Sequence, residues 1–213
     1  MSILREIAEN LERGDEEGVA ALVRKALDGH YPPLAILHEG LIAGMDVVGA
    51  RFRERDIFLP DVLLAARAMH VGLDLIKPLL GQDGLPMAGR VVIGTVRGDL
   101  HDIGKNLVGI MLRGAGFEVI DLGNDVPPER FVDVARERGA SIIGLSALLT
   151  TTMPAMKEVV ELVRTRGLET SMKVIVGGAP VSESWAREIG ADAYGYDAAN
   201  AVERVRALVA PRA

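Results

Sequence analysis

Short apolar, β-branched segments alternate with amphipathic helical patterns from residue 90 to the end of the chain, and this alternation restricts the possible folds most. The expected strands are residues 91–96, 118–122, 141–146, 173–176 and 191–194, and the expected helices are residues 103–115, 128–138, 152–166, 181–189 and 198–209. Strands and helices that alternate at this spacing form βαβ units, which place parallel strands in one sheet and helices on both of its faces. We therefore expect residues 90–213 to form a doubly wound, Rossmann-like α/β domain with a five-stranded parallel sheet.

The first 80 residues show no strand pattern and carry four helical segments instead. These segments run from Ser2 to Glu12, from Asp15 to Leu27, over residues 34–52, and from Pro60 to Leu80. Ser2 and Asp15 are residue types that cap helix N-termini, and Pro60 suits a first helical position. Helices with short connections predict an all-α bundle over residues 1–80. The Gly- and Pro-containing residues 81–89 predict a linker to the α/β domain.

Composition excludes several functional classes. The chain of 213 residues contains no cysteine, which excludes disulfides, cysteine-ligated zinc, iron–sulfur clusters and thiol catalysis. Its net charge of −6 argues against a general nucleic-acid binder, which would carry a basic face. The N-terminus is acidic and amphipathic, unlike a secretory signal, and no apolar run reaches the roughly 18–20 residues that span a bilayer. We therefore expect a cytoplasmic protein with neither nucleic-acid nor membrane partners.

The most informative residues follow the first expected strand. They form the run Gly98-Asp99-Leu100-His101-Asp102-Ile103-Gly104-Lys105-Asn106. Open α/β sheets bind their ligands at the carboxyl ends of the strands, which is where His101 falls. Asp99 stands two residues before His101, close enough to hydrogen-bond the far nitrogen of the ring. A carboxylate that fixes one imidazole nitrogen while the other faces a metal is typical of metal-ligating histidines.

The ends of the later strands add hydroxyl groups and glycines to the same edge of the sheet. The residues concerned are Ser146, Thr150 and Thr152 after the third strand, Gly177 and Gly178 after the fourth, and Tyr196 after the fifth. Residues with little side chain let a flat or elongated ligand approach the backbone. A single histidine cannot hold zinc, which takes three or four protein ligands. A metal at this edge would therefore bring its own equatorial ligands, as cobalt does in a corrin.

At these positions the sequence resembles the cobalamin-binding corrinoid proteins of methyltransferase systems, which are related to the cobalamin-binding region of methionine synthase. The matching motifs are Asp99-x-His101-x-x-Gly104, Ser146-x-Leu148 and Gly177-Gly178, in that order, and the longer string Asp102-Ile103-Gly104-Lys105-Asn106. The N-terminal region resembles the helical cap of the same family, from residues 49–52 through Phe58-Leu59-Pro60 to residues 66–69. The resemblance covers nearly the whole chain.

The resemblance implies a cobamide bound base-off and His-on, with His101 as the lower axial ligand of cobalt. Asp99 would accept a hydrogen bond from His101, and Thr152 stands where methionine synthase has the serine that completes this relay. Ser146 and Thr150 would contact the nucleotide tail of the cofactor. The rest of the implied cofactor-binding set is Asp102, Ile103, Gly104, Leu148, Gly177, Gly178 and Tyr196, with Phe58 and Met69 as candidates for an apolar cover over the upper face.

The implied function is that of a corrinoid methyl carrier, which is a non-catalytic subunit of a methyltransferase system. Its implied partners are a donor-specific methyltransferase and an acceptor methyltransferase, with a reductive activator as a further candidate. Methanol, methylamines and methoxylated aromatics are the donors consistent with the resemblance. The alternative function is a cobalamin-binding sensor or regulatory protein, although no recognition helix or basic face is evident at the N-terminus.

Each candidate residue also has a purely structural interpretation. His101 could be a loop histidine hydrogen-bonded to an aspartate, and Thr152 could cap the helix that follows it. Gly177 and Gly178 could form a simple turn. Phe58 and Met69 stand at helical spacing, so they could belong to the core of the bundle instead of covering a cofactor.

Overall fold

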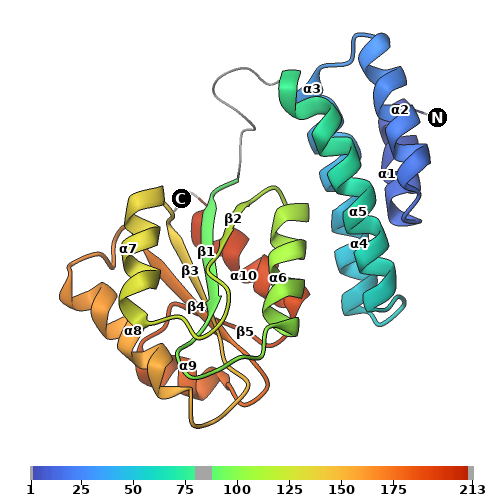
Figure 1. Ribbon diagram of the computed structural model, residues 1–213. Coiled ribbons are helices and arrows are strands. Elements are labelled where there is room, and N and C mark those ends of the chain that lie inside the picture. Colours follow the sequence, from blue (N-terminus) through green and yellow to red (C-terminus); the bar gives the residue numbers. More distant parts are fainter. Residues whose placement is uncertain (1, 80–87, 211–213) are drawn as a thin grey trace. The chain divides into compact units, whose positions relative to one another are not determined.

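The computed structural model describes residues 2–79 and 88–210 and divides into two compact units, one helical and one α/β (Figure 1). The predicted linker, residues 81–89, lies outside the described residues except for Ala88 and Gly89.

The helical unit contains the four expected helical segments, with small differences at their ends. Its elements are α1 (Ile3–Glu12), α2 (Glu16–Asp28), α3 (Pro33–Ala35), η1 (Ile36–Ile42), α4 (Ala43–Arg53), α5 (Leu59–Ile76) and η2 (Lys77–Leu79). Asp15 caps α2 as predicted, since its Oδ1 accepts a hydrogen bond from the Gly18 N–H at 2.9 Å. Ser2 precedes α1 but makes no capping hydrogen bond with its side chain, so that prediction is wrong. The helix still forms because its apolar face is buried.

The third helical segment departs from the expected regular helix. Elements α3, η1 and α4 follow one another without a break, and η1 is a π-helix. This stretch, Pro33–Arg53, is long and apolar enough to cross a membrane, contrary to the expectation that no such run exists. Within its most apolar window 39 % is buried inside the protein. A core helix of a bundle has the same length and composition, so this finding is weak support for a membrane span.

The α/β unit has the predicted architecture, and the fold class is confirmed. Its strands are β1 (Arg90–Thr95), β2 (Glu118–Asp121), β3 (Ile142–Ser146), β4 (Lys173–Gly177) and β5 (Ala193–Gly195). They form one five-stranded sheet in the order β2-β1-β3-β4-β5, in which every neighbouring pair is parallel. The helices are α6 (Ile103–Gly114), α7 (Pro128–Arg138), α8 (Pro154–Thr165), α9 (Glu183–Ile189) and α10 (Ala198–Val209).

The helices cover both faces of this sheet, with α7 and α8 on one face and α6 and α10 on the other (Figure 1). This division follows from strand order, because right-handed crossovers that move in opposite directions along a sheet place their helices on opposite faces. The core on the α7 face includes the fully buried Val92, Phe131 and Met156. Gly94 allows this packing, because a Cβ at that position would lie 2.6 Å from the ring of Phe131.

The strand order places a topological switch at β1. Strand β2 lies on one side of β1 and β3 lies on the other, so the loops after β1 and β3 diverge to opposite faces. A crevice outside the carboxyl ends of the strands is the usual ligand site in such sheets. The loop after β1 carries His101, and the loop after β3 carries Thr150 and Thr152.

Candidate functional site: an imidazole fixed by a buried carboxylate

His101 lies in the loop between β1 and α6, with its ring held by Asp99. The ring Nδ1 lies 2.8 Å from Asp99 Oδ1, and the same oxygen accepts a hydrogen bond from the His101 backbone N–H at 3.1 Å. The Asp99 side chain is fully buried, whereas 52 % of the His101 side chain is exposed. A carboxylate can only accept, so the Nδ1 atom carries a proton, and in the neutral ring the lone pair then lies on Nε2. The ring is therefore held with its Nε2 atom directed away from Asp99.

The second oxygen of Asp99 ties this loop to the loop after β3. Asp99 Oδ2 accepts hydrogen bonds from the backbone N–H groups of Leu148 at 2.8 Å and Leu149 at 3.2 Å. The hydroxyl of Thr152, which is buried, lies 2.8 Å from the same oxygen and 2.8 Å from the Leu149 carbonyl oxygen. The structure thus brings His101, Asp99 and Thr152 together in the order that the resemblance implies.

The environment of Asp99 keeps its carboxyl ionised. Burial by itself raises the pKa of the Asp99 carboxyl, because it penalises the charged form. Hydrogen bonds from the Leu148 and His101 backbones, the His101 ring and the Thr152 hydroxyl outweigh burial and hold the pKa of Asp99 well below its usual range. The Asp99 carboxylate therefore carries its full negative charge beside the His101 ring at neutral pH.

Large apolar side chains are exposed at the carboxyl edge of the sheet, on the loops after β1, β3 and β5 and at the start of α6. Leu100 is 69 % exposed and Ile103 is 75 % exposed, while Leu148, Leu149 and Tyr196 on the later loops are 42–60 % exposed. Gly104 adds open space, since a Cβ built there would meet no atom within 4 Å. Exposed apolar side chains clustered around a polar group are typical of ligand sites.

Two glycines at the carboxyl end of β4, the last strand residue Gly177 and the following Gly178, are required by close backbone contacts. Gly178 has a φ of +131°, and a Cβ there would collide with the carbonyl oxygen of Ala147. A Cβ on Gly177 would lie 2.9 Å from the carbonyl oxygen of Gly195. These contacts bring the loops after β3, β4 and β5 together at one edge, which also carries Ser146.

The site offers one histidine and no set of protein ligands for a bare ion. Within residues 2–79 and 88–210, no group of three or more His, Asp or Glu side chains is placed to hold a metal. A metal bound at His101 would therefore carry most of its coordination shell with it.

Comparison with known proteins shows the family to which the chain belongs. A family described as "B12 binding domain" matches residues 89–205, and a second family of the same description matches residues 3–77. A corrinoid protein of Desulfitobacterium hafniense is 47 % identical over 206 residues, which cover 95 % of each chain. The dimethylamine corrinoid protein of Methanosarcina barkeri is 45 % identical over 210 residues, which cover 98 % of each. This chain belongs to the corrinoid proteins of methyltransferase systems.

Solved structures of relatives agree with this membership. A cobalamin-binding protein from Desulfitobacterium hafniense is 34 % identical, with a TM-score of 0.81, and the match covers 96 % of this chain and 98 % of that one. The methanol:cobalamin methyltransferase complex from Methanosarcina barkeri contains a chain that is 32 % identical, with a TM-score of 0.88. That match covers 97 % of this chain and 79 % of the other. The corrinoid cofactor predicted from the sequence is confirmed.

The residues of this corrinoid protein fit such a cofactor. The His101 Nε2 lone pair can bind cobalt, and the exposed apolar side chains suit a hydrophobic macrocycle. Asn200, in the first turn of α10, is 6 % exposed, and its Oδ1 has no hydrogen-bond partner. A buried acceptor without a partner is rare in a native protein and calls for a water or a ligand group.

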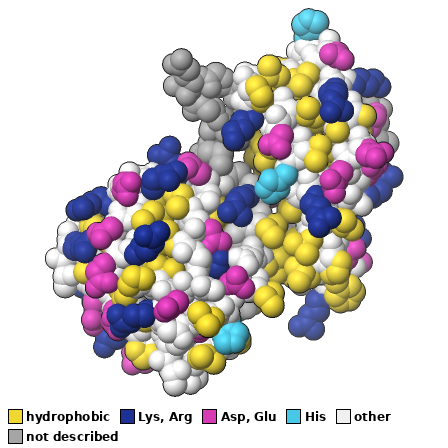
Figure 2. Space-filling view, viewed as in Figure 1, with side chains coloured by type: hydrophobic (Ala, Val, Ile, Leu, Met, Phe, Trp, Pro, Cys, Tyr) yellow, Lys and Arg dark blue, Asp and Glu magenta, His cyan; other side chains and the backbone are white. Residues whose placement is uncertain are grey.

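The helical unit of the corrinoid protein carries an exposed apolar surface of its own. Figure 2 shows hydrophobic side chains gathered over α4 and the start of α5, where the exposed large residues are Val47, Phe58, Leu63 and Leu64. Phe58 is 68 % exposed, as a covering residue would be, whereas Met69 is only 2 % exposed and does not reach this surface. The sequence analysis missed the other three, although their positions on amphipathic helices could have identified them.

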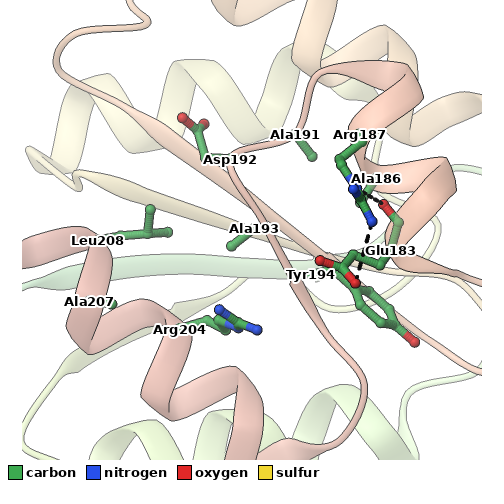
Figure 3. A pocket seen from close by; sticks show the side chains of 10 residues that line it. All are labelled: Glu183, Ala186, Arg187, Ala191, Asp192, Ala193, Tyr194, Arg204, Ala207 and Leu208. Carbon is green, nitrogen blue, oxygen red and sulfur yellow. Dashed lines mark hydrogen bonds and ion pairs between the residues drawn. The ribbon is translucent and has the colours of Figure 1, made fainter.

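A cavity of about 210 Å³ lies elsewhere, at the amino end of β5 (Figure 3). Its lining includes Ala191 and Asp192, which precede β5, Arg204 of α10, and Glu183 and Arg187, which pair with each other on α9. None of the predicted site residues lines this cavity, which lies at the opposite edge of the sheet from His101.

Proposed function

We propose that this protein binds its corrinoid base-off and His-on, with His101 as the lower axial ligand, and carries a methyl group between two partner methyltransferases. A bound corrinoid supplies the chemistry, since its cobalt accepts a methyl group and gives it up again. The observation that carries the proposal is the hydrogen bond between His101 Nδ1 and the buried Asp99, which leaves Nε2 as the only ring atom able to bind a metal.

Asp99 and Thr152 would tune the imidazole as a ligand. A hydrogen bond from the ring to an anionic carboxylate fixes the ring orientation and strengthens the other nitrogen as an electron donor. Asp99 can fill this role because its hydrogen bonds keep it ionised. The Thr152 hydroxyl donates to Asp99 Oδ2 and would moderate that effect, completing a relay of His101, Asp99 and Thr152.

The nucleotide tail would enter the edge formed by the loops after β1, β3, β4 and β5. The residues proposed to hold it are Asp102, Ile103, Gly104, Ser146, Leu148, Thr150, Gly177, Gly178 and Tyr196. Support comes from the open space at Gly104, from the exposure of Leu148, Thr150 and Tyr196, and from the buried Oδ1 of Asn200. Asn200 extends the set predicted from the sequence.

The helical unit, residues 1–80, would cover the upper face of the cofactor. Phe58 and its exposed apolar neighbours supply the surface that this role needs. Met69, the other residue expected to cover the cofactor, could reach that surface only if its buried side chain were repacked. Residues 81–89 would act as the hinge that uncovers the cofactor for each partner, as in other domain-closure mechanisms.

The proposed partners are a donor-specific methyltransferase and an acceptor methyltransferase. Relatives named for dimethylamine and for methanol support either a methylamine or methanol as the methyl donor. A reductive activator as a third partner, and the expected cytoplasmic location, stay predictions.

Electron paramagnetic resonance tests the axial role of His101 directly. Protein uniformly labelled with ¹⁵N is loaded with natural-abundance cobalamin and reduced to cobalt(II). We expect the cobalt lines to split into doublets from a protein nitrogen, and His101→Ala to lose this splitting. Triplets from the cofactor's own base in wild type, or doublets that persist in His101→Ala, would overturn the proposal. His70→Ala is the matched control, because the His70 ring is hydrogen-bonded within α5.

A further inference from the structure

A second loop holds the backbone around His101 from the side opposite Thr152. This brace loop runs from Asp121, the last residue of β2, to Val126, and it contacts the ligand loop, residues 97–102 after β1. Asp125 Oδ1 accepts a hydrogen bond from the Gly98 N–H at 2.7 Å, and the Asp125 N–H donates to the Asp99 carbonyl oxygen at 3.0 Å. The Asn124 side-chain amide donates to the Leu100 carbonyl oxygen at 3.4 Å. Three successive residues of the ligand loop are thus fixed through their backbones.

The conformation of Asp125 allows its two contacts. Asp125 has a φ of +52°, which is the left-handed region that few residues other than glycine adopt. Aspartate tolerates this region better than most residues, and here the turn directs both its N–H and its carboxylate at the ligand loop. Gly98, whose N–H donates to the Asp125 carboxylate, also has a positive φ of 82°. Asp125 therefore holds the ligand loop at Gly98, and glycine has the widest range of backbone conformations of any residue.

The brace loop is itself anchored at both of its ends. At its start, the buried Lys105 of α6 places Nζ 2.7 and 2.6 Å from the two Asp121 oxygens, and Asp121 Oδ1 accepts from the Gly123 N–H. At its other end, Val126 pairs with β1 through the N–H that it donates to the Thr95 carbonyl oxygen. Because both of its ends are anchored, the brace loop can restrain the position of the ligand loop.

We propose that Asp125 is a positioning residue for the axial ligand. Asp99 orients the ring, but Asp99 is itself placed by the backbone that Asp125 holds. With this brace intact, the ligand loop would keep its place whether or not the His101 ring is bound to a metal. Without the Asp125 carboxylate, the Gly98 N–H loses its partner and the loop samples positions in which Nε2 does not reach the metal. The inference rests on the proposed function, since it assumes axial ligation by His101.

Three variants separate this role from general destabilisation. Asp125→Gly removes the carboxylate and keeps a residue that favours a positive φ, which alanine would not. Asp125→Asn removes the charge but keeps an oxygen acceptor. Asp192→Ala is the matched control, because Asp192 Oδ2 accepts the Val174 N–H at 2.9 Å at the amino end of β5, far from the ligand loop along the sheet.

The ¹⁵N-splitting measurement on cobalt(II) then reports the ratio of His-on to His-off protein. Asp125→Gly should lower this ratio about tenfold, as the loss of one hydrogen bond to a charged group would. Asp125→Asn and Asp192→Ala should stay within about twofold of wild type, well inside the effect of one hydrogen bond. A wild-type ratio in Asp125→Gly, or an equal loss in Asp125→Asn and Asp125→Gly, would overturn the positioning role.

Hydrogen exchange of the protein without cofactor gives a second readout. The Gly98 amide should be protected in wild type and in Asp125→Asn, and exposed in Asp125→Gly, whereas Asp192→Ala should affect Val174 only. An unprotected Gly98 amide in wild type would show that the brace is not formed and would overturn the inference. If wild type shows no protein nitrogen on cobalt while Gly98 is protected, the proposed function fails and the brace remains as a structural contact. Should Asp125→Gly not fold, Asn124→Ala tests the same brace and should lower the His-on ratio by a smaller factor.

Discussion

The two units of this protein differ in whether their described residues bury polar side chains. Every buried polar or charged side chain among the described residues lies in the α/β unit, and these are Thr95, Asp99, Lys105, Thr152 and Asn200. The helical unit buries Ile7, Leu11 and other apolar side chains and exposes an apolar surface around Phe58. Buried polar groups are costly unless their hydrogen bonds are complete, so they hold a site in one geometry. Apolar contacts are not directional, so the exposed apolar surface around Phe58 does not fix the geometry of a group that packs against it.

This difference explains why the ligand geometry resides in the α/β unit. The Asp99 carboxylate accepts hydrogen bonds from the loops after β1 and β3 and is the acceptor that joins them. A unit whose core is apolar can shift its packing by small amounts, whereas a buried carboxylate with several donors cannot move without leaving some of them unpaired.

The largest effect is expected when one aspartate is removed from each unit and the losses in unfolding free energy are compared. Asp99→Ala takes the acceptor from three backbone N–H groups and from the His101 ring, so it should destabilise the cofactor-free α/β unit by about 3–5 kcal/mol. Asp61→Ala removes only the acceptor of the Phe58 N–H at the start of α5 and should cost about 1 kcal/mol. Urea unfolding measures both, with Trp185 fluorescence reporting the α/β unit and circular dichroism the helices. Equal losses would contradict the contrast.

The pH dependence of stability sharpens the same point. Because the pKa of Asp99 is lowered by folding, its ionised form stabilises the folded state fully above its unfolded pKa of about 3.9. That contribution is lost as the pH falls from there towards the folded pKa. The difference in unfolding free energy between wild type and Asp99→Asn should therefore shrink by about 1.4 kcal/mol per pH unit below pH 4. A difference that stays constant between pH 7 and pH 3 would show that the charge of Asp99 is not stabilising.

A smaller difference in stability is expected between alanine substitutions at two glycines of the same sheet edge, Gly178 and Gly104. Gly178→Ala forces a side chain against the Ala147 carbonyl oxygen at a φ of +131°, so it should destabilise the apoprotein by about 1–3 kcal/mol. Gly104→Ala adds a methyl group to open space in a helix and should be neutral or stabilising by up to about 1 kcal/mol. Thermal unfolding without cofactor and cobalamin titration measure the two effects. If Gly104→Ala leaves cobalamin affinity unchanged, the space at Gly104 does not receive the cofactor.

The parts of the site that lie close together in the sequence were predictable from it. Asp99 and His101 stand two residues apart, so their pairing depended on a single loop. Thr152 lies 53 residues from Asp99, and only the family resemblance indicated that the two would meet. The role of Asp125 was not predicted, because it hydrogen-bonds Gly98 from a separate loop and no periodic pattern marks it. The π-helical residues of η1 were also missed, since the apolar spacing there suits a regular helix.

The sequence by itself determined the alternation of strands and helices, the helical first unit and the presence of one histidine beside an aspartate. These features depend on residue type and local spacing, which a linear pattern records. Only the tertiary structure decided that Asp99 would be buried and ionised, that Lys105 would reach Asp121, and that the brace loop would hydrogen-bond the ligand loop. The physical reason is the strand order: β1 lies between β2 and β3, so hydrogen bonds between loops distant in the chain form only when the sheet assembles.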